Sequence, residues 1–103
     1  MNKNLKVMRV LVVARDALTR YGWIKGQMGS TKLGFCASGA VRYATDDFKL
    51  SAAAVTVLSR NFTKKYARKY PGTSPISYND ASGRNLGQIL AWFDRAINAA
   101  AGR

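Results

Sequence analysis

The side chains of this sequence that could do chemistry are mostly cations, because its supply of catalytic groups is small. The chain has no histidine, and its five acids are all aspartates: Asp16, Asp46, Asp47, Asp80 and Asp94. Histidine is the usual general base near neutral pH, so acid–base catalysis would have to rely on carboxylates alone. We therefore predict that the protein is not an enzyme, and we expect no catalytic residue, metal site or cofactor.

The remaining reactive groups have structural explanations. Cys36 lies among small apolar residues with no basic neighbour in the sequence, which predicts a packed, reduced thiol. Asp46 and Asp47 are interpreted as helix caps. Asn79 and Asp80 stand between aromatic and glycine neighbours, where an Asx turn or a cap of the last helix is expected. The alternative is a small enzyme with a site centred on Asp80.

A glycine-rich stretch from residue 22 to residue 34 contains residue types that are found in phosphate-binding loops. The order in Gly29-Ser30-Thr31-Lys32 is not that of a P-loop, which needs Gly-Lys-Ser/Thr between a strand and a helix. A simple backbone nest for an anion stays an alternative. Trp23, Lys25 and Lys32 are a possible secondary binding patch on this loop.

The strongest positive signal is the basic charge. The chain carries 17 Lys and Arg residues and a formal charge of +12. So large a charge repels itself, and a polyanionic partner would compensate it. The cations concentrate in one predicted helix, where the proposed contact residues for nucleic acid or another partner are Arg60, Lys64, Lys65, Arg68 and Lys69, supported by Lys49 and Tyr70. The alternative is a solvated helix face that serves only solubility.

The elements that must position these residues are helices. Apolar residues recur at helical spacing and predict helices over 4–21, 35–45, 51–70 and 85–101, with Ser51 and Asn85 as N-caps. The second of these is short, and its small residues Cys36, Gly39 and Ala40 are expected to lie against another helix. The fold class is therefore all-α, with residues 1–103 forming one compact domain of three main helices and one short helix. The predicted core consists of Leu11, Leu18, Leu58, Phe62, Leu90, Phe93 and Ile97.

The lengths of the apolar runs indicate where in the cell the protein is expected. No apolar run approaches the ~18 residues of a membrane span, and the run Val10–Ala14 is too short for the core of a signal peptide. We expect a protein of the cytoplasm, in whatever cell makes it, that has no membrane partner. Its oligomeric state is left open.

Several motifs occur in a familiar order along the chain. They are Arg20-Tyr21-Gly22-Trp23, the segment from Gly34 to Ala40, the segment from Ile76 to Arg84, and Ile89-Leu90-Ala91 leading to Ala96-Ile97. From about Val12 to Ala99 the chain resembles a family of uncharacterised bacteriophage and actinobacterial proteins with a domain of unknown function. Tyr78 replaces the tryptophan expected there, and Phe35 stands where a second cysteine is common. The resemblance implies a phage origin and a helical fold, and it implies no activity.

Together these patterns predict a non-enzymatic binding protein that engages a nucleic acid (DNA or RNA) or a host nucleoprotein complex. Small basic phage proteins often inhibit a host defence or nucleic-acid machine such as a CRISPR effector. Another alternative is a virion or structural accessory protein, which would self-assemble symmetrically.

Overall fold

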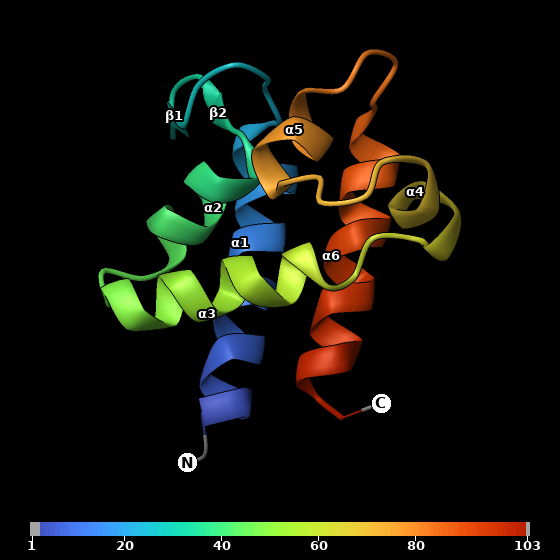
Figure 1. The fold of residues 1–103 in the computed structure, drawn as a ribbon. Helices are drawn as coiled ribbons and strands as arrows, with labels where there is room; N and C mark the ends of the chain where they lie inside the picture. Colours follow the sequence, from blue (N-terminus) through green and yellow to red (C-terminus); the bar gives the residue numbers. More distant parts are fainter. Residues whose placement is uncertain (1–2, 103) are drawn as a thin grey trace.

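The computed structural model describes residues 3–102, and this part of the chain is mostly helical with one small sheet (Figure 1). Its elements in chain order are α1 (Lys3–Tyr21), β1 (Gly29–Ser30), β2 (Gly34–Phe35), α2 (Ala37–Ala44), α3 (Phe48–Ser59), α4 (Lys64–Lys69), α5 (Pro75–Asp80) and α6 (Leu86–Ala100). The prediction of a mostly helical chain is confirmed. The small sheet and the separate helices α4 and α5 differ from the predicted three main helices and one short helix. Among the described residues, no helix combines the length and the apolar character needed to cross a bilayer.

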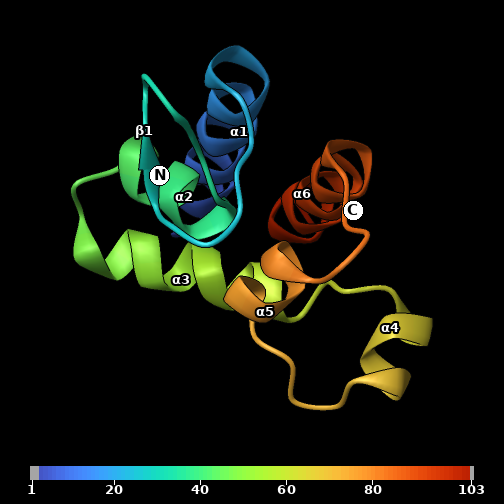
Figure 2. The ribbon, with the colours of Figure 1, turned by 90° about the horizontal axis from the view of Figure 1, so that it is seen from above.

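The core lies where α1 packs against α2, α3 and α6. Helices α1 and α6 lie side by side, and α3 crosses in front of them (Figures 1 and 2). The largest fully buried side chains are Trp92, Phe93, Leu11, Leu18, Leu58, Ile89, Val41 and Asn79. Four predicted core residues are therefore confirmed, whereas Phe62, Leu90 and Ile97 are only partly buried at its edge.

The buried face of α6 differs from the predicted one. Its buried residues are Ile89, Trp92, Phe93 and Ala96. The Trp92 indole Nε1 donates a hydrogen bond of 2.8 Å to the Leu58 carbonyl, so the ring is fixed between α6 and α3. The predicted face of Leu90, Phe93 and Ile97 is rotated away from the centre of the buried face, because Trp92 occupies that position. The predicted N-cap is confirmed: Asn85 and Gln88 form a capping box.

The predicted helix over 51–70 is wrong, since two helices occupy this segment. α3 begins after Asp47, whose carboxylate accepts the Leu50 amide at 3.1 Å, so Asp47 and not Ser51 is the N-cap. α3 ends at Ser59, and α4 begins after a new N-cap, Thr63. Asparagine and threonine favour caps and turns over helix interiors because their side chains bond to the nearby backbone.

Residues 61 and 62 fix this break. The Asn61 side chain donates to the Val57 carbonyl at 2.7 Å, and the Asn61 carbonyl accepts from Arg95 Nε at 2.9 Å. Phe62 then stacks on Trp92, with ring centroids 5.4 Å apart. The chain thus leaves α3 towards α6 before it turns into α4.

The glycine-rich segment between α1 and α2 forms a short hairpin. α1 stops at Gly22, which has φ +101° and donates to the Leu18 carbonyl, as predicted. β1 and β2 then pair antiparallel, with Gly29 opposite Phe35. Gly39 of α2 packs against this segment and not against a helix, because a Cβ at position 39 would overlap the Met28 carbonyl oxygen.

Candidate nucleic-acid interface

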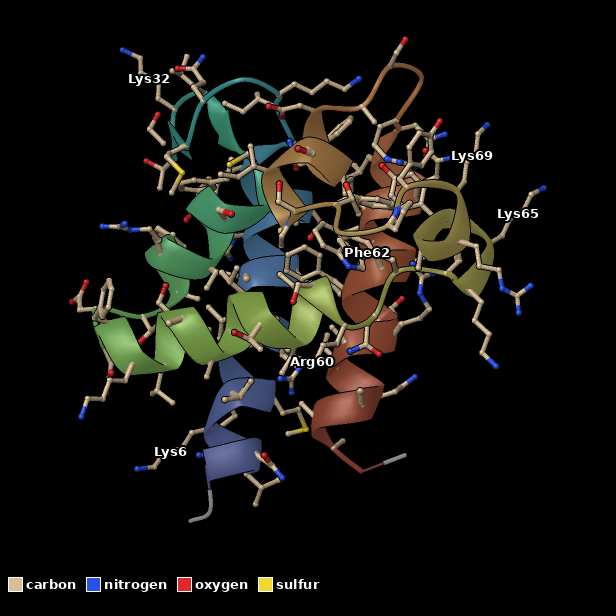
Figure 3. The ribbon with its side chains drawn as sticks, viewed as in Figure 1. Lys6, Lys32, Arg60, Phe62, Lys65 and Lys69 are labelled. Atoms are coloured by element: carbon tan, nitrogen blue, oxygen red, sulfur yellow. The ribbon has the colours of Figure 1, made fainter. Side chains whose placement is uncertain are left out.

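Helix α4 carries the densest group of cations in the described structure. Four of its six residues are Lys64, Lys65, Arg68 and Lys69, and all four side chains are exposed. We call these four residues the α4 cation cluster. None of them forms an ion pair with a described acid, and the sequence has no acid between Lys49 and Asn79. In Figure 3, Lys65 and Lys69 extend away from the body of the molecule.

Aromatic contacts attach α4 to the core. No residue of α4 is buried, and Tyr66 is its main anchor. The Tyr66 ring lies 4.8 Å from the ring of Tyr78 in α5 and 5.7 Å from that of Phe62. Tyr70, next to Tyr66 at 4.8 Å, is 46% exposed, and the Lys69 ammonium lies 5.5 Å from its ring. Tyr66 therefore packs, whereas Tyr70 keeps a face that could stack on a base.

The two other predicted contact residues lie outside this cluster. Arg60 is the C-cap of α3, so the predicted row of Arg60, Lys64 and Arg68 along one helix does not exist. In Figure 3, Arg60 points in a different direction from Lys65 and Lys69. Lys49 is in the first turn of α3, at the end opposite to α4 (Figure 1). The structure thus brings together five of the seven predicted residues, the α4 cation cluster and Tyr70.

The three residues of the predicted secondary patch are also not all brought together. Lys25 lies 5.7 Å from the Trp23 ring, and its ammonium donates to the Ala81 carbonyl at 2.8 Å. Trp23 is half-buried. Lys32 lies in the turn between β1 and β2 (Figure 3), and no described contact joins it to Trp23 or Lys25. In that turn the Ser30 hydroxyl accepts the amides of Lys32 and Leu33 at 3.2 and 3.1 Å, so these two amides are not free to bind an anion in the alternative backbone nest.

Asn79 has a structural role that the sequence did not reveal. It is 1% exposed, and its Oδ1 accepts from the Trp23 indole at 2.8 Å and from the Ala37 amide at 2.9 Å. Its Nδ2 donates to the Ile24 carbonyl at 3.1 Å and to Asp80 Oδ1 at 2.8 Å. Asn79 therefore joins the glycine-rich segment, α2 and α5, and it does not cap the last helix as predicted. The adjacent aromatic residue Tyr78 was the only hint of burial.

Beside Asn79 lies a hollow of about 220 Å³, with Asp80, Cys36 and Met28 in its wall. Asp80 Oδ1 accepts the Gly26 amide at 3.0 Å, which fixes the carboxylate to the loop. Cys36 is the N-cap of α2, with its sulfur accepting the Gly39 amide, and its predicted burial is confirmed at 7% exposure. The described residues contain no group of three or more histidine, cysteine or acidic side chains that could hold a metal ion.

Few charges compensate the cations of the molecule. The ion pair of the described structure joins Arg15 of α1 to Asp94 of α6, with Nε and Oδ1 2.6 Å apart. A side-chain hydrogen bond with Tyr21 raises the pKa of Tyr43 above its usual value, because it favours the protonated phenol. Neither feature touches α4, whose cations stay fully available to an anion.

The fold and the surface define a small, strongly basic helical domain with a cationic helix attached to its side. Residues 3–99 match the Family of unknown function (DUF6197), and the chain belongs to that family. No curated protein and no solved structure matches the chain.

Proposed function

We propose that this protein is a binding protein that engages nucleic acid, free or within a nucleoprotein, through the α4 cation cluster. The observation that carries the proposal is the placement of four exposed cations, none of them paired with a described acid, on six consecutive residues of a helix that has no buried residue. A helix needed only for packing would not require this composition. These cations would neutralise phosphates at close range and release the condensed counterions into solution, which gives affinity without sequence readout.

The proposal includes the class of partner. On the resemblance to bacteriophage proteins, we propose that the protein acts inside a bacterial host and inhibits a host defence or nucleic-acid machine such as a CRISPR effector. Affinity purification from bacterial lysate, with and without nuclease, tests this part. Capture of a nucleoprotein that is lost after nuclease treatment supports it, and the absence of any nucleic acid from the captured material contradicts it.

The direct test is a fluorescence anisotropy titration with labelled DNA and RNA oligonucleotides over a range of salt concentrations. We expect the logarithm of the dissociation constant to rise linearly with the logarithm of the salt concentration, by about 0.7–0.9 per phosphate neutralised, and to depend little on sequence. Failure to bind any single- or double-stranded oligonucleotide at low salt would end the proposal.

A further inference from the structure

A second cationic feature lies beside α4, in a hollow between α4, α5 and α6. The hollow has a volume of about 200 Å³, and its wall includes Arg84 and Arg95 together with Thr63, Gln88 and Tyr66. No acid contributes to this wall. Asp94, the neighbour of Arg95 in the sequence, is occupied by its ion pair with Arg15 of α1.

The fold holds Arg84 rigidly. Its Nε donates to the Tyr78 carbonyl at 2.9 Å, and its Nη1 lies 3.4 Å from Gln88 Oε1. The guanidinium carbon is 3.7 Å from the Tyr78 ring centroid and 5.0 Å from that of Tyr66, so the planar group stacks on the rings. Nη2 has no hydrogen-bond partner among residues 3–102.

Arg95 is held in a similar way from the other side. Its Nε donates to the Asn61 carbonyl at the break between α3 and α4. Its Nη2 is buried and has no hydrogen-bond partner among the described residues. A buried guanidinium donor without an acceptor is unfavourable. Arg95 lines the hollow, so a small shift of its side chain towards an oxygen bound there would give Nη2 an acceptor.

We infer that this hollow, which we call the Arg84/Arg95 pocket, holds one phosphate group of the nucleic acid bound by α4. Two pre-positioned guanidiniums offer the forked donors that match phosphate oxygens, and a lysine ammonium cannot reproduce that geometry. Thr63 and Tyr66 belong both to the pocket and to the start of α4, so the pocket is continuous with the α4 cation cluster. The inference rests on the proposed function and assigns to it a defined contact.

Charge-neutral substitutions test the pocket separately from the total charge. The double variant Arg84→Lys/Arg95→Lys keeps the charge and loses the forked donors of the guanidinium groups. We expect it to bind a labelled thymidine oligonucleotide about tenfold more weakly than the parent protein, with a similar salt slope. The matched control is Arg9→Lys/Arg20→Lys on the exposed side of α1, which should bind like the parent protein. If the parent protein binds and both double variants bind equally well, the inference is overturned and the proposed function stands.

A second measurement needs no variant and covers the case in which Arg84→Lys or Arg95→Lys disturbs folding. The parent protein is titrated with inorganic phosphate, and the arginine Nε–Hε signals are followed by NMR at constant ionic strength. We expect saturable shifts at Arg84 and Arg95 that chloride does not produce. If the oligonucleotide does not bind, the proposed function fails, and these signals alone decide the pocket: shifts specific to phosphate support an anion site, and their absence overturns it.

Discussion

At the scale of single residues, Asn79 has the most consequential position in the molecule. One buried amide satisfies the Trp23 indole, the Ala37 amide and the Ile24 carbonyl, which come from two different segments. Asparagine suits this position because it offers acceptors and donors on one short side chain without a charge. An aspartate would bring a buried charge and would lose both donated hydrogen bonds.

Removal of this amide should therefore be costly. Asn79→Ala leaves the Trp23 indole and the Ala37 amide without acceptors, and we expect a loss of about 3 kcal/mol in the free energy of unfolding. The matched control is Asn98→Ala on the exposed side of α6, which should change stability by less than about 0.5 kcal/mol. Urea denaturation followed by circular dichroism measures both, and equal midpoints for the two variants would show that Asn79 is dispensable.

The environment of some side chains could not be predicted from the sequence. Tyr66 and Tyr70 both continue the four-residue spacing that begins at Phe62. Tyr66 nevertheless packs on Tyr78, while Tyr70 is exposed. The difference depends on α5, whose position is set by contacts far along the chain. The role of Arg84 as a stacked, fixed guanidinium is hidden for the same reason.

At the scale of elements, local signals predicted helix ends well where a cap acts alone. Gly22, Asp47 and the Asn85–Gln88 capping box do what the sequence predicts. The break between α3 and α4 was missed because Leu58, Phe62 and Tyr66 keep a four-residue spacing across it. What stops α3 is long-range: Arg95 binds the Asn61 carbonyl, and Phe62 stacks on Trp92. The spacing of apolar residues along the sequence predicts neither of these contacts.

The contact between α2 and the hairpin segment is another element-level feature that can be tested. Gly39→Ala would force the Met28 backbone away from α2, and we expect a loss of about 1–3 kcal/mol in the free energy of unfolding. The shift should also speed the reaction of Cys36 with a thiol reagent, because Cys36 is the N-cap of α2.

The control for this helix is Arg42→Ala, an exposed position of α2 where we expect a change below about 0.5 kcal/mol. If Gly39→Ala denatures at the same urea concentration as the parent protein and leaves Cys36 equally protected, the close approach of α2 to Met28 is not a constraint.

At the scale of the whole molecule, the charge is spread widely but its density is uneven. Exposed cations occur on α1, α2 and the hairpin turn as well as on α4, so a long-range field attracts polyanions from several sides. Only α4 adds a local density of four cations in six residues. The sequence places these cations in one segment, but it did not predict that the segment is a separate short helix without Arg60.

Charge removal at matched positions separates the local cluster from this general field. The α4 variant replaces Lys64, Lys65, Arg68 and Lys69 with glutamine, which has a similar helix propensity, so α4 should remain folded. The control variant replaces Lys6, Arg9, Arg20 and Arg42, which are exposed on α1 and α2, with glutamine and therefore has the same net charge.

The decisive measurement is the salt dependence of oligonucleotide binding by the parent protein and these two variants. Our account predicts that the α4 variant loses most of its affinity and that its log–log salt slope falls by roughly 3, from about 0.7–0.9 for each of the four cations. The control variant should keep a slope within about one unit of that of the parent protein. Equal losses in the two variants, or full affinity of a folded α4 variant at every salt concentration, would contradict the assignment of α4 as the binding surface.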